Sequence, residues 1–254
     1  MVDLGKGTPL EFPHLLTLAL QKGIFRIGDF DGFRIGFNQF LIADEAPTLI
    51  HTGTYPKYDG IRAQIRKVLD PATLRYIVIP HFESDECGGM DRFLAEAPGA
   101  KLVCSAVGAR INLAGWNAPP PHTVWQDDTL DLGRHRLRFL MTPHVHHWDS
   151  MMVFEESEGV LFPADLFLQP GDQPPTTMED LSQEMLQDYR TIGIMPSEDA
   201  VRRVLDRMDR MPIRHVNPMH GACIPVEALA PYVRALREEP FAYSGTLLGK
   251  EVVY

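Results

Sequence analysis

An apolar run that ends in alternating polar residues, RYIVIPHFESDE at residues 75–86, decides the fold that this sequence predicts. Residues 75–80 have the apolar, β-branched composition of a buried strand. If the backbone stays extended beyond the strand, the side chains of His81, Glu83 and Asp85 point to the same side. Two carboxylates and an imidazole in one small volume repel one another or stay protonated unless a cation binds. The stretch therefore predicts half of a metal site at a strand end.

The sequence around this stretch alternates between strand and helix patterns and predicts a mixed α/β (α+β) fold. In the first half we expect strands at residues 33–42, 48–51, 75–80 and 101–104, helices at 60–69, 90–97 and 107–113, and a Pro-rich turn at 118–121. In the second half we expect antiparallel strands at 137–141, 151–154 and 160–162, a last strand at 213–217, and helices at 178–189, 197–211 and 226–236.

Further candidate ligands follow the expected strands of the second half. His144, His146 and His147 form a cluster after the 137–141 strand, Asp165 stands in an otherwise apolar stretch, and His220 follows the last strand. A single His or Asp near a strand end is more often hydrogen-bonded or solvated than bound to metal. The whole set, with HxExD followed by a histidine, Asp165 and His220 in this order, is a stronger indication of a metal site, because the packing of a core does not require it.

Composition limits the classes of function. The chain has 254 residues and 44% hydrophobic residues, which is compatible with one domain that spans residues 1–254. A net charge of −10 argues against nucleic-acid binding. Three cysteines without a CxxC pair predict neither disulfides nor a zinc ribbon and fit a reducing cytoplasm. The apolar run at residues 15–20 is too short to cross a membrane, and residues 1–14 show no export signal, so we expect a cytoplasmic protein with no membrane contact.

Taken in order, these residues resemble the metallo-β-lactamase fold, and more narrowly the diiron core of flavodiiron proteins and their stand-alone relatives, the oxygen-binding diiron proteins. The resemblance extends from residue 36 to residue 221, and its most specific parts are HxExD at 81–85, HWDSM at 147–151 and LFxxDxF at 161–167. It implies an αββα sandwich. Too few residues follow His220 for a flavodoxin-like FMN domain, so we expect no bound FMN.

The resemblance also implies a ligand set. One iron would be held by His81, Glu83 and His147, and Asp165 would bridge it to a second iron held by the two remaining ligands, Asp85 and His220.

Three positions are left open by the resemblance. Glu86 stands where the family usually has a histidine, and it could coordinate through oxygen, leave a water-filled position or lie outside the shell. His144 and His146 have no clear family role: either could compensate for the missing histidine, although solvated turn residues or donors behind the ligands are the simpler interpretation. His51 stands where the fold commonly has an aspartate, which predicts a different environment around the ligands.

The carboxylate Glu83 favours iron over zinc. Zinc enzymes of this fold resemble HxHxDH, in which imidazoles suit a tetrahedral ion, whereas an added carboxylate favours iron or manganese. We therefore expect two iron ions, with zinc or manganese as alternatives, in a non-haem diiron protein that binds or reduces dioxygen, nitric oxide or peroxide. Such a protein requires an external redox partner or acts as an oxygen sensor, and the resemblance leaves a homo-oligomer open. The alternative function is a binuclear zinc metallo-hydrolase.

Overall fold

The computed structural model describes residues 15–30, 34–114 and 119–253. The predicted absence of an export signal concerns residues 1–14, which lie outside the described residues. Residue 33, where a predicted strand begins, and residue 118, where the predicted Pro-rich turn begins, also lie outside them. No helix in the described ranges is both long enough and apolar enough to cross a membrane.

The first of two large sheets has seven strands in the order β1 to β7, and it begins antiparallel and ends parallel. Pairs from β1 to β4 are antiparallel, and pairs from β4 to β7 are parallel because helical segments connect those strands. The strands are β1 (Leu16–Gln21), β2 (Ile24–Asp29), β3 (Phe37–Ile42), β4 (Thr48–Ile50), β5 (Tyr76–Val78), β6 (Lys101–Ser105) and β7 (His122–Val124).

The second sheet has six strands in the order β13-β12-β11-β10-β9-β8. Its pairs are antiparallel except β11 with β12, which is parallel. The strands are β8 (Thr129–Asp131), β9 (Arg136–Met141), β10 (Met151–Glu155), β11 (Val160–Phe162), β12 (His215–Val216) and β13 (Ile224–Pro225). A separate hairpin, β14 (Thr246–Leu247) and β15 (Lys250–Glu251), follows near the C-terminus.

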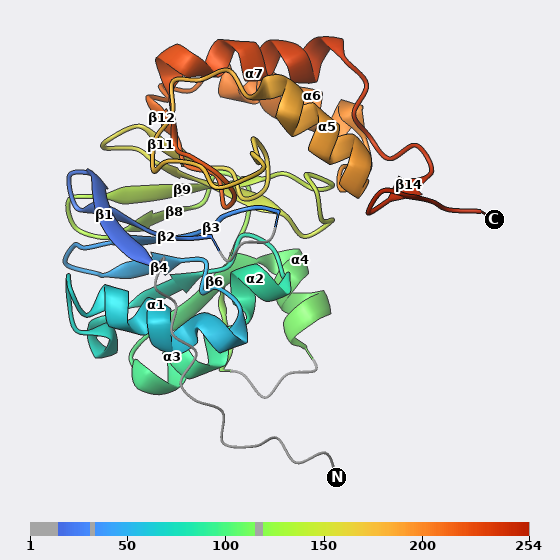
Figure 1. Ribbon diagram of the computed structural model, residues 1–254. Coiled ribbons are helices and arrows are strands. Elements are labelled where there is room, and N and C mark those ends of the chain that lie inside the picture. The colour runs from blue at the N-terminus through green and yellow to red at the C-terminus, as the bar shows by residue number, and fades with distance from the viewer. Residues whose placement is uncertain (1–14, 31–33, 115–118, 254) are drawn as a thin grey trace.

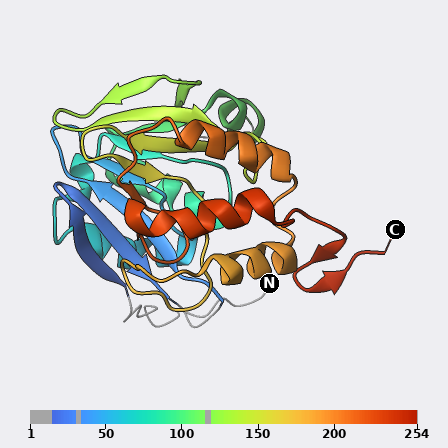
Figure 2. The same cartoon turned by 90° about the horizontal axis from the view of Figure 1, so that it is seen from above.

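Helices cover the outer face of each sheet and complete the predicted αββα sandwich (Figure 1). The first sheet is covered by α1 (Tyr58–Ile65), α2 (Ser84–Cys87), α3 (Met90–Glu96) and α4 (Ala106–Gly108), with the helical turns Tyr55–Lys57, Pro71–Thr73 and Ala109–Leu113. The second sheet is covered by α5 (Ser182–Ile192), α6 (Glu198–Met208) and α7 (Val226–Glu238). Figure 2 shows these three helices side by side, with α7 in the middle.

Strand alternation divides the core into layers. Phe40 of β3 points between the sheets, where its ring centroid lies 5.0 Å from that of Phe162 of β11. Its neighbour Leu41 points to the opposite face and packs with Ile61 of α1. On the other side of the sandwich, Leu161 packs with the helices that cover the second sheet. Apolar residues at successive positions of one strand therefore pack alternately in the layer between the sheets and in the layer between a sheet and its helices.

The sequence predicts the central elements better than the edges. The β3–β4 pair, β5, β6, β9 to β11 and the helices α1, α3, α5, α6 and α7 match their predictions to within a few residues. The hairpin of β1 and β2 was not predicted, nor were β7, β8 and β13. Strand β1 is an edge strand with exposed Leu16 and Leu18, so it lacks the contrast between a buried face and a polar face.

The site is formed where strand ends from both sheets meet. β4, β5 and β6 run in the same direction, and in the second sheet β9, β11 and β12 share one direction. A hydrogen bond from Met151 N to Pro80 O, 3.0 Å long, joins the sheets at this edge. The loops that carry the predicted ligands therefore leave the core side by side.

The Phe40–Phe162 contact gives a test of the layered core. We expect Phe162→Ala to lower the free energy of unfolding by roughly 3–5 kcal/mol, because it opens a cavity between the sheets. The exposed Met178→Ala should change it by less than about 0.5 kcal/mol. Urea denaturation followed by circular dichroism measures both, and equal losses would contradict this description of the core.

Candidate metal centre

The predicted HxExD ligands leave β5 in two conformations. Glu83 is extended, with φ −125° and ψ 155°, and α2 begins at the next residue. His81 and Glu83 therefore point to one side, and His81 Nε2 lies 3.3 Å from Glu83 Oε2. Asp85 belongs to the first turn of α2 and faces His220 instead. The expectation that an extended backbone continues as far as Asp85 is wrong, because the helix starts earlier and turns this carboxylate toward a second group.

Asp165 lies between the two groups of side chains. It is 2% exposed. One oxygen, Oδ2, lies 2.8 Å from His146 Nε2 and 3.6 Å from His81 Nε2, and the other, Oδ1, lies 3.4 Å from His220 Nε2. The hydroxyl of Tyr189 donates to the Asp165 carbonyl at 3.1 Å and so fixes the loop. A single carboxylate thus faces both groups.

The first group contains His81, Glu83, His146 and His147, whose ligand atoms lie within 4.8 Å of one another. Glu83 Oε2 is 3.2 Å from His146 Nε2 and 4.0 Å from His147 Nε2. The structure thus brings the predicted ligand His147 to the rim, with 36% of its side chain exposed, and places His146 further inside. His144 is exposed and outside this group.

The second group contains Asp85, Asp165 and His220. His220 Nε2 lies 3.4 Å from an oxygen of each carboxylate. The opposite ring nitrogen, Nδ1, donates to the Gly36 carbonyl at 2.9 Å, so Nε2 is the nitrogen that faces the carboxylates. Burial lowers the pKa of His220, but Asp165 and Asp85 raise it well above its ordinary value, so Nε2 keeps a proton when no metal is bound. The ring of Phe37 packs edge-on against the imidazole, with centroids 5.2 Å apart.

Glu86 contacts the first group from behind. Its Oε2 accepts from the backbone N of His81 at 3.1 Å and lies 3.3 Å from Nδ1 of the same residue. Its Oε1 lies 3.3 Å from Nδ1 of His51, which is fully buried. The ligand atoms of His81, Glu86 and Asp165 also fall within 4.8 Å of one another. In this arrangement Glu86 orients two imidazoles, and it is not paired with His220.

Asp149 connects two of the loops that carry candidate ligands, although the sequence analysis assigned it no role beyond its place in HWDSM. Its Oδ2 accepts from Phe82 N at 3.3 Å and from Asn112 Nδ2 at 2.9 Å. Its carbonyl accepts from Ser105 Oγ at 2.8 Å. The buried carboxylate therefore holds the loop of His147 against the loop of Phe82. Its position in the sequence, two residues after the candidate ligand His147, was the only local indication that Asp149 supports the site.

The pKa shifts in the centre show that its buried carboxylates stabilise positive charge on the neighbouring imidazoles. Burial lowers the pKa of His81, but Glu86 and Asp165 outweigh it and raise that pKa to about 10. Burial also lowers the pKa of His146, whereas hydrogen bonds to Asp165 and Glu83 raise it to about 9. Hydrogen bonds from His146 and His81 hold the pKa of Glu83 well below its usual range. Without metal, these imidazoles keep protons to balance the carboxylates.

His147 differs from its neighbours. Burial lowers its pKa, and the nearby His146 and His81 lower it further. A neutral imidazole has a free lone pair, which is the form that binds metal. His147 is therefore available as a ligand from the rim of the site.

The first group of side chains fits one metal ion, and Asp85, Asp165 and His220 offer a second, wider set of donors, in which His220 Nε2 is 3.4 Å from each carboxylate. Asp165 Oδ1 is buried without a hydrogen-bond partner among the described residues, although His220 Nε2 lies 3.4 Å away. Unsatisfied buried polar atoms of this kind are uncommon in folded proteins and require an explanation. Bound cations on both sides of Asp165 would satisfy its carboxylate and would replace the protons on the imidazoles.

Comparison with known proteins places the chain among diiron relatives. The family model described as ODP family beta lactamase matches residues 35–221. A nitric oxide reductase of Moorella thermoacetica is 25% identical over 197 residues, which cover 73% of this chain and 48% of that protein. The flavo-diiron protein FprA2 of Clostridium acetobutylicum is 27% identical over 202 residues, covering 76% of this chain and 50% of that protein. The chain thus spans about half the length of these relatives.

Solved structures show the same fold. The rubredoxin oxygen:oxidoreductase of Desulfovibrio gigas superposes with a TM-score of 0.78 and 23% identity, covering 89% of this chain and 62% of that chain. The chemotaxis sensor ODP, solved as a peroxy diiron species, gives a TM-score of 0.75 and 17% identity, covering 89% of this chain and 96% of that chain.

The raised pKa values predict how stability depends on pH without metal. The folded-state pKa values of His81 and His146, about 10 and 9, exceed the ordinary value of 6.5. Their contribution to stability is complete below pH 6.5 and is lost as the pH rises through 9 to 10. We therefore expect the free energy of unfolding of the metal-free protein, measured with urea and EDTA, to fall over that range.

Variants test the source of this dependence. His146→Gln should make the decrease shallower, because it removes one of the two groups, whereas His122→Gln, which changes an exposed histidine in β7, should leave the slope unchanged. If both variants keep the full slope, the protons on the buried imidazoles are not its cause.

Proposed function

This chain belongs to the ODP family of beta-lactamase-like proteins, and from that membership we propose that it holds a non-haem diiron centre that binds or reduces dioxygen, nitric oxide or peroxide. The observation that carries the proposal is the position of Asp165, with one oxygen toward His146 and His81 and the other toward His220. Each side also has its own carboxylate, Glu83 or Asp85. A bridging carboxylate between two mixed nitrogen and oxygen donor sets is suited to a pair of metal ions.

The proposed first iron is held by His81, Glu83 and a histidine of the His146–His147 pair. The sequence assigned His147, but the distances favour His146, which is closer to Glu83 and is the one that touches Asp165. His147 would then complete or close the site from its rim.

The proposed second iron is held by Asp85, His220 and the shared Asp165. The first iron has Asp165 in addition to its three own ligands, so the second has one protein ligand fewer. Glu86 lies behind His81 and supplies no donor paired with His220. An iron with an open position can bind a small molecule, and a reduced pair can supply electrons to it. The chain's own residues hold and orient the centre: Gly36 fixes the ring of His220 through its Nδ1.

Iron is preferred in this proposal because the centre is rich in oxygen donors. Glu83, Asp85 and Asp165 all contribute carboxylate oxygens, which suit iron or manganese better than a tetrahedral zinc site. Names of relatives support the same choice, since they include a flavo-diiron protein and a diiron sensor. Zinc and manganese remain the alternatives that metal analysis must separate.

Reduction of the bound molecule requires electrons, and we propose that an external redox partner supplies them. One relative is named a nitric oxide reductase and another a rubredoxin oxygen:oxidoreductase, while the chemotaxis sensor ODP supports a role in oxygen sensing. The three free, buried cysteines support a reducing cytoplasm as the place of action. Self-association of the chain is also compatible with this proposal.

Metal analysis and spectroscopy test the diiron centre. Protein from iron-supplemented cells, prepared without oxygen, should contain two irons per chain and should gain visible absorption and an altered Mössbauer spectrum on exposure to oxygen. Asp165→Asn should bind at most one iron and lose the oxygen response, because a neutral amide replaces the negatively charged carboxylate that both irons would share. Protein that contains only zinc and gives no oxygen response after ferrous reconstitution would contradict the proposal. It would support the alternative function, a binuclear zinc metallo-hydrolase.

The two adjacent histidines can be separated by matched variants. We expect His146→Gln to lower the affinity of the first iron by at least tenfold, because it removes the buried imidazole next to Glu83 and Asp165. His147→Gln should have a smaller effect on affinity and a larger one on the rate of reaction with oxygen, because it lies at the rim. Competition with a calibrated chelator and stopped-flow absorption measure these quantities, and the reverse order would restore the assignment of His147.

A further inference from the structure

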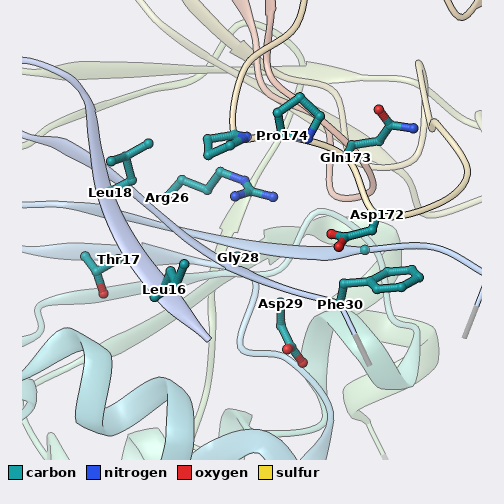
Figure 3. A pocket seen from close by; sticks show the side chains of 13 residues that line it. Leu16, Thr17, Leu18, Arg26, Gly28, Asp29, Phe30, Asp172, Gln173 and Pro174 are labelled. Carbon is teal, nitrogen blue, oxygen red and sulfur yellow. The ribbon is translucent and has the colours of Figure 1, made fainter. Parts of the chain in front are cut away.

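A pocket lies at the edge of the sandwich and contains none of the proposed metal ligands, although Gly36 and Gly221, next to His220, are part of its lining. It has a volume of about 640 Å³, within the range of small-molecule sites. Figure 3 shows the guanidinium of Arg26 in its middle, with side chains of β1 on one side and the segment from Asp172 to Pro174 on the other. The residues that matter here are Leu16, Leu18, Arg26, Gly28, Asp172 and Pro174.

Arg26 is a charged residue at a core position. It pairs in register with Phe40, whose side chain points between the sheets, so Arg26 points the same way. It is 8% exposed, and burial lowers its pKa. In the described part of the chain its guanidinium makes one hydrogen bond, from Nε to Asn38 Oδ1 at 2.7 Å. Both terminal amino groups therefore have donors left for a bound acceptor.

Gly28 makes room for this guanidinium. A Cβ atom at this position would lie 2.3 Å from Nη1 of Arg26, which is too close for any real contact. A larger residue would push the guanidinium away from its place beside Asn38. The absence of a side chain at Gly28 thus leaves the guanidinium room for its position beside Asn38.

The walls of the pocket define the chemistry of its ligand. Leu16 and Leu18 are 65% and 44% exposed and form an apolar wall on one side of the pocket. Pro174 adds apolar surface opposite them, while Asp172 places one negative charge near Arg26 and disfavours ligands with several negative charges. We propose that this pocket binds an amphipathic organic monocarboxylate, with its carboxylate on Arg26 and its apolar part against Leu16 and Leu18.

The pocket is connected to the loop that carries His220. Asn38, which accepts from Arg26, donates through Nδ2 to the carbonyls of Pro218 and Gly221, both at 2.8 Å. A carboxylate on Arg26 would therefore act on the loop next to the metal centre through a single side chain. Binding in the pocket does not depend on the proposed diiron function, whereas any effect of binding on the metals does.

Calorimetry on the full-length, metal-free chain tests binding with octanoate as the probe. Octanoate should bind more tightly than acetate, which lacks the tail, and more tightly than octan-1-ol, which lacks the charge. Arg26→Gln should weaken octanoate binding by about tenfold or more, because it removes a charge-assisted hydrogen bond. Arg66→Gln, which removes the same charge from an exposed position, should leave binding unchanged.

A second variant keeps the test valid if Arg26→Gln does not fold. Leu18→Glu adds a negative charge at the mouth of the pocket without changing the buried contacts, and it should also weaken octanoate binding by about tenfold. No octanoate binding by the unaltered chain, or equal binding by the unaltered chain and Leu18→Glu, would overturn the proposal.

The link to the loop is read from the amide signals of Met219 and His220, which do not line the pocket, in ¹H–¹⁵N spectra of the metal-free chain. We expect octanoate to shift these signals in the unaltered chain and in Arg66→Gln but not in Arg26→Gln. Binding without any shift of these signals would overturn the link. This readout contains no metal, so its failure is distinct from failure of the diiron proposal.

Discussion

The buried carboxylate of Asp165 is the constraint on which the rest of the centre depends. A negative charge that is 2% exposed is costly unless positive charge surrounds it, and here imidazoles approach it from both sides. Burial raises the pKa of Asp165, but His220 and His81 lower it well below its ordinary value. The ligands from four loops are therefore held together by the need to neutralise one group, with protons or with metal ions.

The sandwich meets this need by bringing strand ends together. Both sheets send parallel strands to the same edge, so loops that are distant in sequence converge without any long connection. A second layer then fixes the ligand rings: Glu86 holds His81, Gly36 holds His220, and Asp149 ties neighbouring loops. This layer makes the two groups unequal, because the extra carboxylate supports only the first.

A second buried charge, of opposite sign, lies near the loop of His220. Arg26 is buried beside Asn38, and Asn38 in turn holds the loop of His220. The proposed metal centre and the edge pocket thus share a structural element, although their chemistries differ. Such an arrangement allows one site to sense the other through the position of a loop, provided that the ligand prefers one loop position.

The sequence by itself determined which loops carry candidate ligands, because HxExD after an apolar strand, Asp165 in an apolar stretch and His220 after a last strand are local patterns. The αββα fold followed from the resemblance that these patterns carry in order. Only the tertiary structure decided which of His146 and His147 faces Asp165, since adjacent residues in a turn carry the same composition signal but point in different directions. It also turned Asp85 away from His81 and Glu86 toward it, because the helix starts at Ser84. The sequence did not predict that Arg26 is buried, because the burial of a charged side chain depends on contacts with residues of other strands, such as Asn38.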